Sequence, residues 1–501
     1  MKGCLHDSFL ALVMLVACCQ VMQAAPHSFP HTYPFTIDTV KRTGRIKETI
    51  LRDTSTQYAW VNRIYILGNK KTRERIIERE LTLKPGDSVQ LSQLPKILEK
   101  DQQRLFNLQL FNSAEVRAFE SGPKTIDLLV EVNERWYTFP VPIFQLADRN
   151  FNEWWQTYNH DISRVMYGLK LYQYNMRGRN ETLTFTAQFG FIQRFELMYR
   201  VPYFDRKQKQ GLIFQADYID AKNVAYRTQD HRLVFLETDQ VLRNSNGVGV
   251  TYTYRNNFYR YHRFGYQFRY TSISDSLNRA NPNYLGPDRL NQQFDMLMYQ
   301  FIADYRDVVA YPLSGYNFLF TLQKYGFAFT EDLEKLDLSF HYAHYLDLKK
   351  NFYLSNFTFG YWSNRDDIPY YNYGAMGYNR IFLRGHELNV IEGPTYFLNK
   401  TTLKKKIFSQ TYSLPGSRFK QFKYMPLAIY LKTYFDFGYV KNYSAYENAF
   451  PPQNTILTNN MISGTGIGLD FVALYDSVFR LEYSFNSIGY NGLFIHIKKE
   501  F

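Results

Sequence analysis

The last nine residues, 493–501, read LFIHIKKEF and decide the fold class of this chain. Side chains along a β-strand alternate between its two faces. This alternation separates two sets: Leu493, Ile495, Ile497 and Phe501 on one face, and Phe494, His496, Lys498 and Glu500 on the other. The first face is apolar and the second is mostly polar, so the stretch predicts an amphipathic strand that closes on an aromatic residue.

A C-terminal strand of this kind is typical of an outer-membrane β-barrel. An open sheet edge cannot exist in lipid, so the strand is expected to pair on both edges. The alternative is a soluble β-protein that ends on phenylalanine by chance. Composition favours the barrel, because the 501 residues include 43 Tyr and 42 Phe, and barrels place aromatic side chains at both membrane interfaces.

Hydropathy and charge narrow the class further. The mean hydropathy is −0.40, and beyond the N-terminal segment no apolar run is long enough for a membrane-spanning helix. The net charge is +13, but Lys and Arg are dispersed and no nucleic-acid recognition motif is present. We therefore expect no nucleic-acid partner, and assign the positive charge to a barrel lumen or to outer-membrane lipid headgroups.

The N-terminal segment, residues 1–24, has the features of a signal peptide, with Lys2, an apolar core and a small-residue cleavage site at Ala24. A competing interpretation is a lipobox that would make Cys18 a lipidated N-terminus. Every cysteine of the chain lies within this segment. The rest of the chain is therefore expected to have no disulfide and no thiol chemistry. Residues 25–59 are polar and predict a linker.

Residues 60–136 predict a compact α/β module with the order β-α-α-β-β. A first strand ends at the turn Gly68-Asn69, and Thr72 sits where a helix N-cap belongs. The next helix has a periodic apolar face, and the last strand alternates cleanly: Leu94, Ile97, Leu98, Leu105 and Leu108 in the helix, and Ile126, Leu128, Val130 and Val132 in the strand. Such a module buries its own small core.

From residue 137 to residue 501 the apolar period is two, which predicts a transmembrane barrel of about 16 antiparallel strands. Candidate strands are residues 165–175, 181–192, 195–201, 212–218, 249–254, 261–273 and 396–407. Turns are expected at 177–180 and at 244–247, and long loops at 275–291 and 364–392.

Two sets of motifs carry a resemblance to a known family. The strand into Gly68-Asn69, with residues 79–81, 86–87, 104–107 and 134–135, resembles a POTRA domain. Leu383-Arg384-Gly385-His386 resembles the VRGF/Y motif of the BamA/TamA family of outer-membrane POTRA-barrel proteins, the bacterial surface antigen type. Leu383 and His386 depart from the family's Val and aromatic residue. The resemblance covers roughly residues 60–501.

The resemblance implies a role for Arg384. In the family, the motif lies on a loop folded back into the barrel lumen, where its arginine pairs with an inward-facing acid. Asp436 lies in the stretch YFDFG, similar to the family's F-x-D-x-G strand, and Glu482 is a second candidate partner. A guanidinium suits a buried carboxylate because it binds bidentately and stays charged. The glycine-rich string at 464–470 lacks the features of a dinucleotide site and predicts a strand instead.

The resemblance also implies a lateral seam between the first barrel strand, expected near 165–175, and the last. Gly492, Phe494 and Phe501 form the last strand and its C-terminal signal. In the family this seam opens so that a client strand pairs with the exposed edge.

The expected function is insertion or translocation of client proteins at the bacterial outer membrane, with the POTRA domain in the periplasm. Expected partners are unfolded outer-membrane or secreted clients, periplasmic or lipoprotein accessory subunits, and outer-membrane lipids. The alternatives are a dedicated secretion translocator for one or a few clients and a passive porin-like channel. The sequence holds no catalytic motif and no metal-ligand spacing, so we expect no enzyme, no metal and no cofactor.

Overall fold

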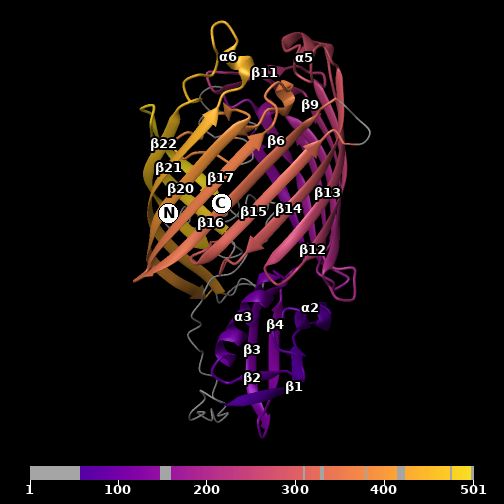
Figure 1. Cartoon of the computed structure of the whole chain (residues 1–501), viewed down its shortest axis with the longest axis vertical. Coiled ribbons are helices and arrows are strands. Elements are labelled where there is room, and N and C mark those ends of the chain that lie inside the picture. Colours follow the sequence, from indigo (N-terminus) through magenta and orange to yellow (C-terminus); the bar gives the residue numbers. More distant parts are fainter. Residues whose placement is uncertain are drawn as a thin grey trace, which may run out of the picture.

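The computed structural model describes residues 57–146, 159–308, 311–327, 332–377, 381–413, 424–473 and 477–497. The signal segment, Cys18, most of the expected linker and Phe501 lie outside these residues. Two parts are visible: a small α/β domain and a large barrel above it (Figure 1).

The small domain is built from six elements: β1 (Tyr58–Leu67), α2 (Glu74–Glu78), β2 (Ser88–Gln90), α3 (Leu94–Asn107), β3 (Phe111–Gly122) and β4 (Thr125–Glu134). Its sheet has the order β2-β1-β4-β3, with β1 and β4 parallel. Both helices contribute to a core that includes Ile76, Ile77, Leu105, Val116 and Val130. The short strand β2 is an addition to the expected β-α-α-β-β order.

The turn after β1 requires glycine. Gly68 has φ +91°, and a Cβ atom built there would lie 1.9 Å from the carbonyl oxygen of Val132. The expectation that Thr72 caps the next helix is wrong, because Arg73 holds the N-cap position of α2 without a side-chain bond. Thr72 instead donates its hydroxyl to Glu134 (2.6 Å). The Asn69 amide donates to the Thr72 carbonyl (3.2 Å) and tightens the same turn.

The barrel is one antiparallel sheet of 16 strands. In chain order these are β5 (Thr138–Leu146), β6 (Val165–Met176), β7 (Glu181–Gly190), β8 (Ile192–Val201), β9 (Gln210–Ala221), β12 (Arg243–Arg255), β13 (Arg260–Ile273), β14 (Asn291–Asp304), β15 (Gly315–Tyr325), β16 (Lys335–Lys349), β17 (Phe352–Ser363), β20 (Thr395–Ser413), β21 (Tyr424–Lys441), β22 (Met461–Ala473), β23 (Ser477–Asn486) and β24 (Asn491–Ile497).

Two sequence-based expectations about the barrel strands are wrong. The first strand is β5 and not the strand at 165–175, which is the second. Prolines at 140 and 142 concealed β5, since proline is confined to sheet edges. The turn expected at 244–247 lies inside β12, whose residues pair with both β9 and β13. Backbone pairing on both sides there outweighs the turn preference of its Asn and Gly residues.

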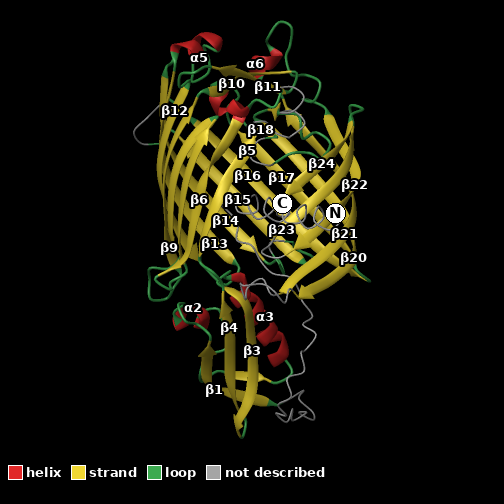
Figure 2. Ribbon diagram, turned by 180° about the vertical axis from the view of Figure 1, so that it is seen from behind, coloured by secondary structure: helices red, strands yellow, loops and turns green. Residues whose placement is uncertain are grey.

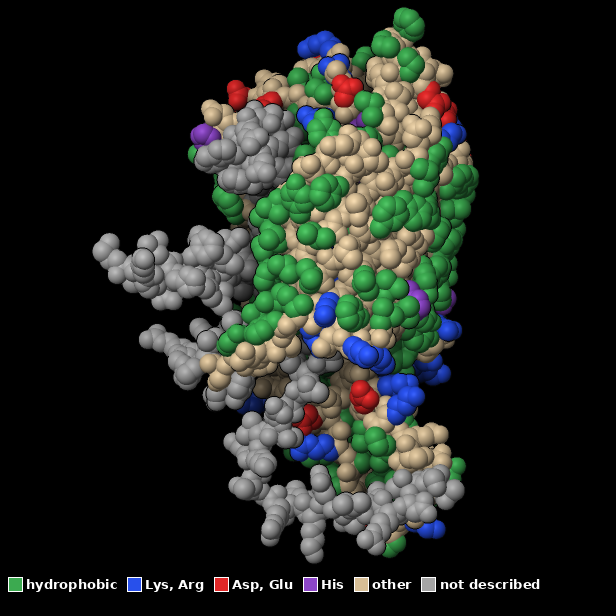
Figure 3. Space-filling model, turned by 90° about the vertical axis from the view of Figure 1, so that its left-hand side faces the viewer, with side chains coloured by type: hydrophobic (Ala, Val, Ile, Leu, Met, Phe, Trp, Pro, Cys, Tyr) green, Lys and Arg blue, Asp and Glu red, His purple; other side chains and the backbone are tan. Residues whose placement is uncertain are grey.

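The two faces of the strands explain their composition. In β21, Leu431 and Phe435 are exposed on the outside, whereas Lys432 and Asp436 are buried on the inside. Figure 3 shows hydrophobic side chains spread over the barrel wall, with Lys and Arg toward its two ends. No helix among the described residues is long and apolar enough to cross a membrane.

Short elements cap the barrel end that lies away from the small domain (Figure 2). They are η1 (Ile162–Arg164), β10 (Asn223–Gln229), β11 (Arg232–Glu237), α5 (Asp275–Ala280), η2 (Tyr370–Asn372), β18 (Ala375–Met376), β19 (Ile391–Glu392) and α6 (Ser444–Glu447). α5 occupies the expected loop at 275–291, and β18 and β19 lie in the loop at 364–392.

At the opposite end, strands β20 and β21 project beyond their neighbours. β17 pairs with β20 only as far as Lys405. From Phe408 to Ser413, β20 pairs with β21 alone among the described residues. β21 keeps its other neighbour β22 as far as Leu427, so the two strands form a two-stranded ribbon beyond that residue, on the side of the small domain.

Candidate functional site in the barrel lumen

The loop between β17 and β20 folds back into the lumen and carries Arg384. Leu383 anchors it, because its side chain is 1% exposed and packs in a cluster with Met376, Leu398 and Val440. Hydrophobic burial of one side of the loop thus places the next residue, Arg384, against the inner wall.

Arg384 binds Asp436 bidentately. Its Nε donates to Oδ2 (2.8 Å) and its Nη2 to Oδ1 (2.5 Å), and the backbone N–H of Arg384 also donates to Oδ2 (3.2 Å). Nη2 reaches Thr402 Oγ1 as well (2.9 Å), and the guanidinium lies 3.8 Å above the Tyr434 ring. Asp436 is fully buried, so these contacts replace its lost water and hold the loop on β21.

The Arg384–Asp436 pair belongs to a larger buried charge network. Glu482 on β23 lies 3.7 Å from Arg384 Nη1 and 2.8 Å from Lys432 Nζ. Lys432 also contacts Asp470 (2.5 Å). Each buried carboxylate therefore has at least one cation beside it, which offsets the cost of removing these charges from water.

The other residues of the Leu383–His386 motif pack directly against the backbone of strand β22 and its neighbour. A Cβ atom built on Gly464 would lie 1.8 Å from the Arg384 carbonyl oxygen, so only glycine lets the loop come this close to β22. The Gly385 carbonyl accepts from Asn486 Nδ2 (2.6 Å), and His386 Nε2 lies 3.2 Å from the Ser463 carbonyl oxygen. His386 therefore contacts the wall with a polar bond in place of the family's aromatic ring.

The last strand also reaches this network. His496 Nε2 lies 3.4 Å from Glu482 and 3.7 Å from Glu387 of the lumen loop. Phe494, two residues earlier, stacks on the His496 ring with centroids 6.4 Å apart. Gly492 pairs with Ser484 of β23. The lumen loop is thus coupled to the strand at the edge of the sheet.

Glu387, Glu482 and His496 bring three metal-ligand atoms within 4.8 Å of one another. Lys432 and Arg384 already contact Glu482. Two cations therefore occupy the space and charge that a metal ion would need, and we assign no metal to this cluster.

Sequence reasoning missed several parts of this site: Thr402, Tyr434, Lys432, Gly464 and Asn486. One signal could have found Gly464. The glycines at 464, 466 and 468 are spaced by two and therefore lie on one face of a strand. Three bare positions on an inward face indicate that another segment lies against it.

The two edge strands of the sheet, β5 and β24, are not joined by a backbone ladder within the described residues. Every other pair of neighbours in the sheet is hydrogen-bonded. Pro140 and Pro142 of β5 lack N–H groups and lie at alternate positions, so they face the same edge. Such residues are tolerated where the N–H side points away from the paired neighbour β6, which is toward the seam.

The small domain meets the barrel through a second buried ion pair. Glu80, at the end of α2, accepts two hydrogen bonds from Arg255 of β12 (2.6 and 2.8 Å). Arg79 stacks on Tyr203 at 3.3 Å and contacts Glu80 (3.1 Å). Burial alone raises the pKa of the Glu80 carboxyl, but the attraction of these arginines outweighs it and leaves the pKa below the ordinary glutamate value.

Fold and site together define a class: an outer-membrane β-barrel that carries a POTRA domain and a loop locked in its lumen. Family models agree. The POTRA model, described as a surface antigen variable number repeat, matches residues 60–135, and the Omp85 superfamily domain matches residues 175–473. The second match covers more than half of the chain, which therefore belongs to the Omp85 superfamily. The predicted fold class and family are confirmed.

The solved structures that this chain resembles are related to it at low sequence identity. CdiB from Escherichia coli is 10% identical with a TM-score of 0.53, over 88% of this chain and 76% of that one. BamA from Haemophilus ducreyi lacking POTRA domains 1–3 is 15% identical with a TM-score of 0.49, over 88% and 83% of the two chains. A search of curated protein sequences finds no match.

Proposed function

We propose that this Omp85 protein inserts or translocates client proteins at the bacterial outer membrane through a lateral seam between β5 and β24. The observation that carries the proposal is that no ladder joins these two strands within the part of the chain that the structure describes. An unpaired strand edge is a template for an incoming strand, and its backbone groups would bind a client strand by β-augmentation. Pro140 and Pro142 support it, because they deny β24 a complete set of hydrogen-bond donors.

The proposed organisation follows. Residues 1–24 are a signal peptide, with lipidation at Cys18 as the alternative, and residues 25–59 are a linker. Residues 60–136 form a POTRA domain in the periplasm, and residues 137–501 form the barrel. Unfolded clients are the main partners, with periplasmic or lipoprotein accessory subunits and outer-membrane lipids. The free energy of client folding drives the process, and no enzymatic step is involved.

The proposal is tested by locking the seam. Phe144 on β5 and Ile495 on β24 both point outward, with 64% and 60% of each exposed. The barrel holds no native cysteine, so Phe144→Cys with Ile495→Cys can be joined selectively by short bifunctional maleimides. The matched control joins Leu481→Cys to Ile495→Cys, which sit on strands already paired.

We expect the amount of client protein in the outer membrane to fall when the seam is locked. It should stay normal in the control. Normal client levels with the locked seam would overturn the proposal. The same proteomic comparison separates the two versions of the function. A broad fall in barrel proteins indicates a general insertase, whereas loss of one or a few exported proteins indicates a dedicated translocator.

The loop held inside the lumen argues against a passive porin-like channel. The Arg384 loop lies across it and is held by buried ion pairs to β21 and β23. A freely conducting pore would have to release these contacts.

A further inference from the structure

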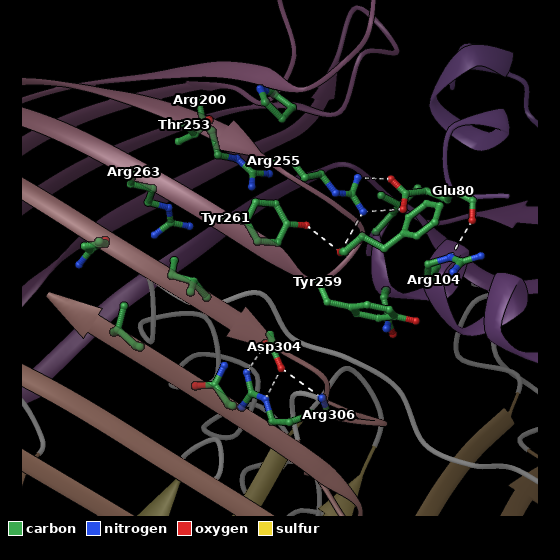
Figure 4. A pocket seen from close by; sticks show the side chains of 18 of the residues that line it. Glu80, Arg104, Arg200, Thr253, Arg255, Tyr259, Tyr261, Arg263, Asp304 and Arg306 are labelled. Carbon is green, nitrogen blue, oxygen red and sulfur yellow. Dashed lines mark hydrogen bonds and ion pairs between the residues drawn. The ribbon is translucent and has the colours of Figure 1, made fainter. Parts of the chain in front are cut away.

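A cavity lies in the lumen at the end where the POTRA domain meets the barrel. Its volume is about 220 Å³, and its wall is formed by inward side chains of strands between β8 and β16. Glu80 and Arg104 of the POTRA domain line one end of it (Figure 4). This cavity is separate from the Arg384 network, none of whose residues lines it.

The cavity is strongly cationic. Charged side chains of both signs line it: Arg104, Arg200, Lys209, Arg255, Arg263 and Arg306, against Glu80 and Asp304. Both acids are already matched. Glu80 is bound bidentately by Arg255, and Asp304 accepts from Arg306 Nε (2.8 Å) and Nη2 (2.7 Å). Arg104 pairs with Asp101 behind the wall, which leaves Arg263 as an inward-facing arginine of the cavity with no carboxylate partner among the described residues.

Arg263 on β13 is the clearest case of an unbalanced positive charge in the cavity. Its Nε is buried and has no hydrogen-bond partner among the described residues, and no ion pair of Arg263 occurs among them either. Arg200 on β8 donates to a neutral partner, Thr182 Oγ1 (3.2 Å). Figure 4 shows the side chains of Arg200 and Arg263 entering the same space beside Tyr261. Two like charges that share a sheltered space repel each other unless an anion lies between them.

We propose that this cavity binds a phosphate-type oxyanion between Arg200 and Arg263. Each carboxylate of the cavity satisfies one arginine, whereas a phosphate group carries up to two charges and three acceptor oxygens, which suits two guanidiniums at once. Binding would give the Arg263 Nε a hydrogen-bond partner and remove the cost of an unsatisfied buried donor. The phosphate comes either from free inorganic phosphate or from the headgroup of an outer-membrane lipid.

The test uses the full-length protein in detergent with inorganic phosphate or pyrophosphate, at fixed ionic strength and with chloride as reference. The midpoint of barrel melting, read by heat modifiability in electrophoresis, reports binding because a ligand stabilises the folded state. We expect phosphate to raise the midpoint of the wild type. Arg263→Gln should bind at least about tenfold more weakly, as for the loss of a charged hydrogen-bonding group.

Arg260→Gln is the matched control. Arg260 lies on the same strand, is exposed, and donates to Tyr305 without lining the cavity. It should leave the phosphate effect unchanged. Without phosphate, Arg263→Gln should melt no lower than the wild type, because the substitution removes an unbalanced charge; a lower midpoint would assign Arg263 to the fold alone and overturn the proposal. Arg200→Gln provides a second variant of the same site.

An absent phosphate effect, or an equal effect in wild type and Arg263→Gln, would also overturn the proposal. The source is then settled by mass spectrometry of lipids that copurify with the protein. A phosphate-bearing lipid retained by the wild type and lost in Arg263→Gln identifies the headgroup as ligand. Phosphate binding without such a lipid identifies the free anion. The inference does not depend on the proposed seam, since neither β5 nor β24 lines the cavity.

Discussion

Two buried arginine–carboxylate pairs hold this molecule together, and they differ in their surroundings. In the lumen, Arg384 binds Asp436 with Glu482 nearby, so the arginine has a second carboxylate in reach. At the domain junction, Arg255 binds Glu80, and among the described residues no other carboxylate forms an ion pair with Arg79 or Arg255. The lumen lock therefore has a second carboxylate in reach, whereas the ion pair at the junction has one. Hydrogen bonds to neutral acceptors also join the two domains there, from Arg73 Nε to the Arg177 carbonyl (3.2 Å) and from Asn175 Nδ2 to Thr72 Oγ1 (2.9 Å).

The difference predicts that Glu80→Ala has the largest effect. It leaves Arg255 buried without its carboxylate, which should cost about 3–5 kcal/mol. Hydrogen exchange should show loss of protection in α2 and α3, while the barrel keeps its heat modifiability. Glu78→Ala changes an exposed residue at the end of α2, two positions before Glu80, and should have little effect. Equal protection in Glu80→Ala and wild type would contradict the special role of the junction.

Breaking the lumen lock should cost less, about 2–4 kcal/mol, because Glu482 partly compensates for a missing Asp436. Arg384→Ala and Asp436→Ala should both lower the heat resistance of the barrel, and the double variant should add little. Arg365→Ala removes an exposed ion pair with Asp367 in the same long loop and should change stability by less than about 1 kcal/mol. Fully additive losses in the double variant would argue against the pair.

Gly464→Ala tests the lumen site without a change of charge. The added methyl group collides with the Arg384 carbonyl, so the loop must shift, at a cost of about 1–3 kcal/mol. Melting should be lowered in the wild-type background and less so when Arg384 is already replaced. An unchanged midpoint would mean that the loop does not lie against β22.

The smallest effect should be a reversible dependence of POTRA-domain docking on pH. The pKa of Glu80 is lower in the folded protein than its ordinary value of 4.5. Its contribution to docking is therefore fully present above that value and is lost as the pH falls through the folded pKa. Protection of α2 and α3 should decline below about pH 4.5, and Glu80→Gln should flatten this dependence. The same decline in Glu80→Gln would assign it to other groups.

The two sites also differ in how far the sequence reveals them. The Arg384–Asp436 contact could be anticipated, because both residues lie in motifs and the strand period places Asp436 on the inner face. Glu80 and Arg255 are separated by 175 positions and belong to different domains. Neither the alternation of side chains along a strand nor a sequence motif indicates that they are in contact. The barrel was predictable from β24, but β5 was hidden because its prolines contradict the usual preference of a strand interior.

The β20–β21 ribbon has a consequence for solubility. Beyond Lys405, β20 has lost its neighbour β17, and an exposed row of backbone groups of this kind invites pairing with a second copy of the chain. Lys405, which is exposed, and Lys406 mark the point where this free edge begins, whereas Lys404 is buried beside Tyr311. Lysine beside a bare edge disfavours strand-to-strand aggregation, since two copies would bring like charges together. The ribbon thus carries its own protection against self-association at the place where the barrel wall no longer shields it.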